Sequence, residues 1–505
     1  MINGVDDLLA EAGPERVLEL FQDAQVPSEG NRESQAQFLG GLADEAELFH
    51  TLQGDGYARI SVNGHREIWM IRSTWFRQWL IRRFYESRRK PPGSQALQDA
   101  IGLLEARSRY EGSEVPLHVR VAGRDKTVYI DLCDAEWRAV EITPDGWRIL
   151  ADPPVHFRRA KGMLPLPCPQ SDGSIESLRG LINVGTDSNW ILCASWIVAA
   201  FRPTGPYPIL ILQGEQGSAK STMEKILRRI VDPSVALVRT PPRDERDLLI
   251  AANNSWVIAY DNLSGIPHWL SDSLCRLATG GGFSTRELYT DSEEIFFEAM
   301  RPVLLNGIDQ LAERADLADR ALVLNLPRIS DSARRDEAHL YAEFELSLPR
   351  ILGAIFTATS VALSRIEQVN LVRKPRMADF ALWAAAAEPA LGFAEGSFME
   401  TYDGNRAEAV QDLLESDPIA GSICSLLGAL EGEHWEGSCK ELLARVETYV
   451  SEGTKRSRAW PHSPRGLSGR LRRLATVMRE SGIEIAFGPR GTNGQRTVVI
   501  TKNVV

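Results

Sequence analysis

Hydrophobic and polar positions follow different patterns in different parts of the chain. Short alternating segments at 117–121, 127–132 and 137–142 indicate strands, and Pro-Asp-Gly at 144–146 indicates a turn. From about 170 to 330, short apolar runs alternate with helical stretches, which predicts a parallel sheet flanked by helices. A Pro-rich segment precedes this region, and an Ala- and Leu-rich helical stretch follows it. We therefore predict four domains, at residues 1–166, 167–335, 336–412 and 413–505.

The candidate chemistry begins at a short apolar run, Tyr207–Leu212, which is typical of a strand buried on both faces of a parallel sheet. A Gly-rich segment with Lys220-Ser221 follows, and then apolar residues at helical spacing up to Pro233. Strand, Gly-rich turn, Lys-Ser and helix are the parts of a phosphate-binding loop, in which backbone N–H groups and the helix N-terminus surround phosphates. We expect Lys220 to reach the β- and γ-phosphates of ATP and Ser221 to bind Mg²⁺. The expected nucleotide-binding residues are Gly214, Glu215, Gln216, Gly217, Ser218, Ala219, Lys220, Ser221 and Thr222.

Two further apolar runs, Trp256–Tyr260 and Pro302–Leu305, are followed by polar residues, Asp261-Asn262 and Asn306. An acid at the end of a strand that neighbours the phosphate loop suits a Mg²⁺ site, so we assign Asp261 to the metal together with Ser221. Asn306 is a candidate to orient the attacking water, and its alternative is an ordinary polar residue at a strand end. The predicted catalytic residues are Lys220, Asp261, Asn262, Asn306, Arg314 and Arg320, and the predicted metal ligands are Ser221 and Asp261.

Arg314 and Arg320 precede a fourth apolar run, Ala321–Leu326. Either Arg is a candidate to stabilise the transferring phosphate from a neighbouring subunit, because a guanidinium compensates charge that develops on phosphate oxygens. The alternative for each is a solvated surface charge.

Charge is distributed unevenly between the body of the chain and its end. Residues 455–505 contain eleven Lys or Arg and two Glu, a net charge of +9, whereas the whole chain carries −11. A helical pattern at 467–478, helices near 419–430 and 440–450, and two strand-like segments at the end predict a winged helix. The basic excess favours DNA contact over a solvated surface. The residues predicted to contact DNA here are Arg465, Arg470, Arg472, Arg473, Arg490 and Arg496.

The order and spacing of these motifs over residues 205–330 resemble the AAA+ ATPase modules of superfamily 3 helicases, particularly the primase–helicase proteins of phages, plasmids and poxviruses. In those proteins, a segment like Leu274–Gly282 precedes a hairpin that lines the channel of a ring and touches single-stranded DNA, which implies DNA contacts for Arg286 and Tyr289. The resemblance implies an α/β AAA+ core, with an α+β N-terminal domain and a C-terminal winged helix. It also implies ATP and Mg²⁺ as cofactors, a homo-oligomeric ring, expected to be a hexamer with nucleotide at subunit interfaces, and a primase as partner.

Three features depart from that family. Ala219 stands where a Gly is expected, and Asn262 stands where a second acid normally polarises water, with Asp244 and Glu245 as candidates to replace it. The expected hairpin tip, Thr290–Glu294, is acidic. The ordered motifs favour an ATP-driven DNA translocase or replicative helicase of a mobile element. The departures favour an ATP-controlled DNA-binding initiator or adaptor with little turnover and no unwinding, so both functions stay open.

Composition indicates an ordinary globular protein, because 43% of the residues are hydrophobic and 25% are charged. The longest apolar run, residues 190–201, is shorter than the roughly 20 residues that cross a bilayer. The N-terminus is acidic and amphipathic, unlike a secretory signal. The six cysteines form no CxxC pair and do not indicate a disulfide framework or a zinc site. We expect a cytoplasmic protein.

Overall fold

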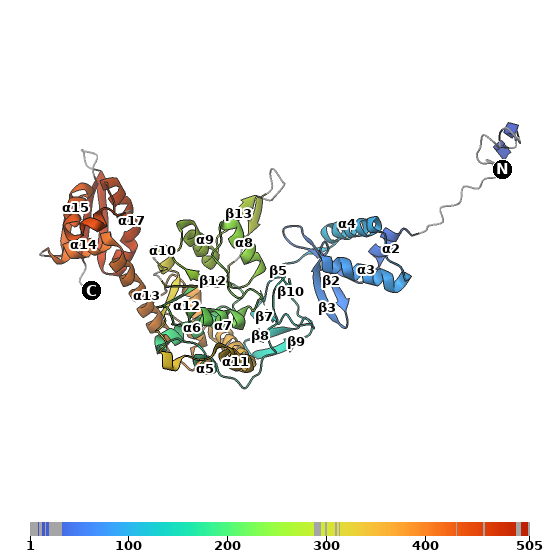
Figure 1. The fold of residues 1–505 in the computed structure, drawn as a ribbon, viewed down its shortest axis with the longest axis horizontal. Helices are drawn as coiled ribbons and strands as arrows, with labels where there is room; N and C mark the ends of the chain where they lie inside the picture. The colour runs from blue at the N-terminus through green and yellow to red at the C-terminus, as the bar shows by residue number, and fades with distance from the viewer. Residues whose placement is uncertain are drawn as a thin grey trace. The chain divides into compact units, whose positions relative to one another are not determined.

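The computed structural model in Figure 1 divides into two compact units, residues 1–116 and 117–505. The sequence predicted a domain boundary near residue 166. In the structure, residues 117–166 belong to the second unit. The structure describes residues 9, 13–15, 17–19, 33–286, 294–297, 300–308, 311–312, 314–430, 432–457, 460–490 and 496–502, with backbone only for 283–286, 294–297 and 490.

Over residues 33–116, the first unit combines helices with one small sheet. Its helices are α2 (Gln35–Gly41), α3 (Thr74–Arg88) and α4 (Ser94–Tyr110), and its strands are β1 (Glu47–His50), β2 (Gly56–Val62), β3 (His65–Met70) and β4 (Ser113–Glu114). The sheet order is β3-β2-β1-β4, with β1 and β4 parallel and the other pairs antiparallel. Ser73 caps the N-terminus of α3, and Phe76, Leu80 and Phe84 form its buried stripe.

The second unit is built around the predicted parallel sheet. Its strands are β11 (Ile209–Gln213), β12 (Ile258–Leu263), β15 (Val303–Gly307) and β16 (Ala321–Asn325), in the order β12-β15-β11-β16. The helices α7 (Lys220–Val231), α8 (Glu245–Asn254), α9 (His268–Thr279) and α10 (Ala315–Ala318) and the hairpin of β13 (Phe283–Arg286) and β14 (Glu294–Phe297) belong to the same region. Strand β15 lies between β11 and β12. The sequence predicted that the strand with Asp261 neighbours the phosphate loop. In the structure, this strand, β12, is separated from β11 by β15.

A second, antiparallel sheet packs with this region. It has the order β6-β7-β8-β9, from β6 (Val121–Arg124), β7 (Thr127–Asp131), β8 (Ala139–Thr143) and β9 (Gly146–Leu150), and a short parallel pair joins β5 (Leu117–His118) to β10 (His156–Phe157). Strands β8 and β9 lie beside α11 (Glu337–Arg365; Figure 1). The Trp147 ring of β9 packs edge-on against the Phe356 ring of α11. The remaining helices of this region are α5 (Glu176–Arg179), α6 (Asp187–Ala199), α12 (Ala378–Leu391) and α13 (Ser397–Ser416).

Helix α11 is long and apolar enough to cross a membrane by length and composition alone. However, Phe344, Leu348, Ile351 and Phe356 of this helix are buried in the largest apolar cluster, together with residues of α6 and α12. We therefore interpret α11 as a core helix.

The C-terminal elements form a helical group with a three-stranded antiparallel sheet. They run α14 (Pro418–Gly428), β17 (His434–Ser438), α15 (Cys439–Val446), α16 (Glu452–Lys455), α17 (Pro464–Glu480), β18 (Ile483–Arg490) and β19 (Arg496–Lys502). The sheet order is β17-β19-β18. Leu467, Leu471 and Leu474 line the buried face of α17, at the spacing that the sequence predicted. The strand β17 was not predicted, because its residues, His-Trp-Glu-Gly-Ser, are mostly polar or small.

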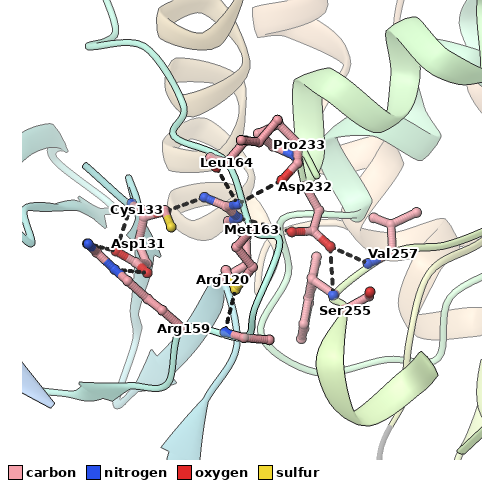
Figure 2. Close-up of polar contacts among 12 residues, drawn as sticks. Arg120, Asp131, Cys133, Arg159, Met163, Leu164, Asp232, Pro233, Ser255 and Val257 are labelled. Atoms are coloured by element: carbon pink, nitrogen blue, oxygen red, sulfur yellow. Dashed lines mark hydrogen bonds and ion pairs between the residues drawn. The ribbon is translucent and has the colours of Figure 1, made fainter. Parts of the chain in front are cut away.

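A buried charge network ties the antiparallel sheet to the C-terminus of α7 (Figure 2). The Arg120 side chain, which is fully buried, donates from Nε to Asp232 Oδ1 at 3.1 Å, and from its other nitrogens to the carbonyls of Asp131, Leu164 and Pro233. Asp232 Oδ2 accepts from the backbone N–H groups of Trp256 and Val257, just before β12. Although burial alone would raise the pKa of Asp232, the Arg228 and Arg120 cations and these N–H donors lower it. The network therefore holds a buried carboxylate in its charged form.

We expect Asp232→Asn to cost the second unit about 3–5 kcal/mol in free energy of unfolding, because it leaves two buried guanidinium groups without their anion. Urea unfolding followed by tryptophan fluorescence measures this loss. The matched control is Glu367→Gln, because the Glu367–Lys126 pair joins the segment just after α11 to the antiparallel sheet region but is 73% exposed on both side chains. That variant should unfold at nearly the same urea concentration as the unchanged protein, because exposed ion pairs contribute little to stability. Equal small losses in the two variants would contradict the buried network's role.

Candidate nucleotide-binding site and nucleic-acid interface

The segment from Gly214 to Ala219 joins β11 to α7 and turns sharply. Gly214, Gly217 and Ala219 have positive φ angles of 151°, 89° and 58°. A Cβ on Gly214 would lie 2.5 Å from the carbonyl oxygen of Leu326, so only Gly fits there. Ala219 adopts the left-handed conformation at the residue before α7, which costs a non-Gly residue about 1–2 kcal/mol. This strain explains why Gly is expected at that position, and the loop keeps its turn with Ala.

The Lys220 side chain folds back over this loop. Its Nζ donates to the carbonyl oxygens of Gly214 and Glu215, at 2.7 and 2.9 Å, and to Ser218 Oγ at 3.3 Å. Burial lowers the pKa of Lys220, and the negative charge of Asp261 opposes that shift. Glu215 and Gln216 are exposed at the tip of the turn. An ammonium is thus held at the centre of a loop whose backbone curves around it.

Three of the predicted residues lie together beside this loop. Ser221 Oγ, in the first turn of α7, donates to Asp261 Oδ1 at 2.9 Å, and Asn306 Nδ2 donates to the same oxygen at 2.7 Å. Asn306, which is 1% exposed, comes from β15, the strand between β11 and β12. The strand order that separates β12 from β11 therefore brings Asn306 between the helix and Asp261. A hydroxyl and a carboxylate oxygen within hydrogen-bonding distance are the ligand types that Mg²⁺ takes.

Glu224, which the sequence analysis did not single out, completes this polar cluster. It lies one turn after Ser221 on the same face of α7, its side chain is fully buried, and its Oε2 accepts a hydrogen bond from Asn306 Nδ2. Its Oε1 has no hydrogen-bond partner among the described residues. Burial, and the nearby charge of Asp261, raise the pKa of Glu224 well above its usual range. The sequence signal that could have identified Glu224 is an acid beside the apolar stripe of this helix, because charged residues are rarely buried without a partner.

Two more residues contact the loop from segments that carry no recognised motif. Asn183 Nδ2 donates to the carbonyls of Ser218, at 2.9 Å, and Pro327, at 2.7 Å. The Arg334 Nη2 lies 3.3 Å from the position of a Cβ built on Gly217, and the same guanidinium pairs with Asp331 at 3.2 Å. Arg334 is therefore a cation beside the phosphate loop in the same chain.

The residues proposed to supply a missing acid have other partners. The Asn262 side chain is exposed, and only its backbone N–H reaches the cluster, donating to Asn306 Oδ1 at 3.0 Å. Asp244 caps α8 by accepting from Asp247 N, and Glu245 pairs with Arg276. Neither acid joins the Ser221, Asp261, Asn306 and Glu224 cluster.

The two candidate trans-acting arginines lie at opposite ends of α10. Arg314 pairs with Asp272 at 2.7 Å and Asp316 at 2.9 Å, and hydrogen bonding to Asp316 raises its pKa. Arg320 donates from Nη1 to the carbonyl of Asp316 at 2.7 Å. Neither guanidinium contacts the phosphate loop of its own chain in the described structure.

The predicted DNA-contacting arginines differ in their surroundings. Arg470 donates twice to Asp417 Oδ2, the acid that caps α14, and Arg472 lies 4.5 Å above the Phe487 ring. Arg473 is exposed in a cleft of about 810 Å³ between α10, α13 and α17. Arg465 and Arg496 are exposed as well. The Arg286 and Arg490 side chains, Tyr289, and most of the predicted hairpin tip lie outside the described residues.

Two family models match most of the second unit. Residues 175–412 match the actinomycete integrative conjugative element replication protein, and residues 407–504 match the C-terminal domain of the RepA protein of these elements. The chain is similar to replication proteins of mobile elements. The first match contains the phosphate loop and its polar cluster, and the second contains the basic C-terminal elements. Residues before 175 lie outside both matches, and no curated protein matches the chain.

Solved structures of the NrS-1 C-terminal region align with most of the chain. One apo form has 11% identity and a TM-score of 0.41, covering 92% of this chain and 99% of that one. Another has 10% identity and a TM-score of 0.38, covering 93% and 100%. TM-scores in this range do not define a common fold.

Proposed function

We propose that this chain is an ATP-dependent DNA translocase or replicative helicase of a mobile element, acting as a ring with nucleotide at subunit interfaces. The observation that carries the proposal is the convergence of Ser221, Asp261 and Asn306 beside the loop that holds Lys220. Similarity to mobile-element replication proteins supports DNA as the polymer on which such an ATPase acts.

The residues of the loop suit ATP with Mg²⁺. The backbone N–H groups at the start of α7 and the Lys220 ammonium would bind the phosphates, while Ser221 Oγ and Asp261 Oδ1 would hold the metal. Bound Mg²⁺ would neutralise charge on the β- and γ-phosphates. Arg334 would add a cation in the same chain, and Arg314 or Arg320 would reach the nucleotide of a neighbouring subunit.

Glu224 is a positioning residue in this proposal, because it acts through Asn306. Its Oε2 accepts one hydrogen of the Asn306 amide, whose other hydrogen goes to Asp261, so the amide plane is held from both sides. The amide oxygen then faces the backbone N–H of Asn262. Because Asn262 has no carboxyl group, the proposal assigns the orientation of the attacking water mainly to Asn306 and Asp261.

Glu224→Ala should therefore lower kcat for ATP hydrolysis by about 10- to 100-fold, the usual effect of losing a partner behind metal ligands, with KM for ATP changed less than about threefold. Glu224→Gln keeps an acceptor oxygen and should restore most of kcat. Steady-state hydrolysis over a range of ATP concentrations measures both constants. Lys225→Ala, on the next residue of α7, is the control. If both Glu224 variants lost stability but kept kcat, the residue would be purely structural.

The C-terminal elements would supply duplex contact. Their order of helix, strand, three helices and two strands is compatible with a winged helix, in which α17 would enter the major groove. Arg465, Arg473 and Arg496 are exposed and are the best placed to meet phosphates, whereas Arg470 stabilises the cap of α14.

One observation favours a second function, an ATP-controlled DNA-binding initiator with little turnover: Asn262 occupies the position of a second acid, with its side chain exposed. A forked DNA with one labelled strand separates the two functions. The helicase proposal expects strand release that requires ATP and Mg²⁺, and rings in electron micrographs. DNA binding and ATP binding without strand release would support the initiator and overturn the helicase.

A further inference from the structure

Helix α3 of the first unit has an exposed face on which aromatic and cationic side chains alternate. Trp75 and Tyr85 are 63% and 50% exposed, although the opposite side of the helix supplies three fully buried apolar residues to the core. Two large aromatic side chains that are at least half exposed on one helix mark a candidate interaction surface. The aromatic-basic face consists of Trp75, Gln78, Arg82 and Tyr85, which fall at helical spacing, and of Arg89, which directly follows the helix.

The surroundings of this face are strongly basic. Residues 72–90 contain seven Lys or Arg and one acid, Glu86. Several of these cations pair with acids, such as Arg82 with Glu86 of the same helix at 2.9 Å and Arg83 with Glu45 at 3.2 Å, but exposed pairs of this kind are weak. Arg89 and Lys90, at the C-terminal end of α3, form no ion pair with any described residue and are exposed.

The Trp75 ring is already ordered for stacking. It lies on Trp69 of β3, with ring centroids 5.4 Å apart and planes at 24°. Trp69 is itself held by a hydrogen bond from Nε1 to Glu67 Oε2 at 2.6 Å. One face of Trp75 is therefore supported by the protein, while the side chain remains largely open to solvent. A rigid aromatic ring next to cations is the arrangement on which unpaired bases stack while their phosphates are neutralised.

We propose that the aromatic-basic face of α3 binds single-stranded nucleic acid. Bases would stack on Trp75 and Tyr85, which are about 15 Å apart along the helix axis, and phosphates would meet Arg82, Arg89 and Lys90. A single strand fits better than a duplex, because paired bases do not expose their faces. This site lies outside residues 175–504, which the family models match, and it requires no nucleotide at the phosphate loop.

Photo-cross-linking of the full chain tests the proposal. The probe is a 30-nucleotide oligothymidine that carries one 5-iodouracil, and adducts are located by mass spectrometry of peptides. We expect adducts on Trp75 or Tyr85, also in the Lys220→Ala protein, so that failure of the ATPase assignment would not remove them. The double variant Trp75→Ala, Tyr85→Ala should lose these adducts and weaken binding of the single strand about tenfold, without changing basal ATP hydrolysis.

The control is Tyr110→Ala, because Tyr110 is 83% exposed on α4 but is flanked by Glu111 and Glu114. It should leave adducts and affinity unchanged. Replacing Arg82, Arg89 and Lys90 with Gln should flatten the dependence of affinity on salt. Adducts found only in other peptides, or displacement by an equal concentration of duplex, would overturn a single-strand site on α3.

Discussion

Replacing Lys220 with Ala is expected to abolish ATP hydrolysis. The ammonium is the only side-chain cation of the described structure that hydrogen-bonds inside the phosphate loop, where three loop oxygens hold it. Without it, the charge of the β- and γ-phosphates has no compensating group at the centre of the loop. Phosphate release at saturating ATP measures the loss, and strand release from forked DNA should disappear with it.

The control is Lys225→Ala, which removes the same charge from the same helix five residues further on. It should retain near-normal hydrolysis. Circular dichroism and urea unfolding would show that both variants are folded. Unchanged turnover in a folded Lys220→Ala protein would remove the phosphate-loop assignment.

Replacing Arg320 with Ala is expected to lower hydrolysis by roughly a thousandfold or more while ATP still binds, if this residue completes the site of a neighbouring subunit. In the described structure, Arg320 donates to the carbonyl of Asp316 and does not contact the phosphate loop of its own chain. Mixing Arg320→Ala with Lys220→Ala should restore part of the activity, since some interfaces then join an intact loop to an intact Arg. An inactive mixture of co-assembled subunits would contradict a shared site.

The same experiment on Arg314 decides which arginine is used. Arg314 is held by Asp272 and Asp316, so reaching another subunit would require it to leave two carboxylates. Arg320 would have to break only one hydrogen bond, to a neutral carbonyl, so we favour Arg320 over Arg314 as the residue that reaches another subunit. Arg376→Ala, which removes an exposed arginine paired with Asp319, is the control for nonspecific loss of charge and should keep hydrolysis.

Local pattern was enough to predict the elements that carry the chemistry. The apolar run before Gly214, the helical spacing after Ser221 and the apolar stripe of α17 are properties of neighbouring residues, and they predicted β11, α7 and α17. Strand β17 was missed because it has a mostly polar sequence and is defined by pairing with β19. Residues 117–166 group with the second unit, where the fully buried Arg120 pairs with Asp232, which is 112 positions away.

The sequence by itself determined which residue types were available for phosphate and metal chemistry, and in what order. Only the tertiary structure decided that β15 lies between β11 and β12, and hence that Asn306 bridges Asp261 and Glu224. It also decided that Arg470 pairs with Asp417, the acid that caps α14, while the Arg473 side chain is exposed. The physical reason is that periodicity records which face of an element is buried, whereas hydrogen bonds between distant side chains depend on strand order and helix packing.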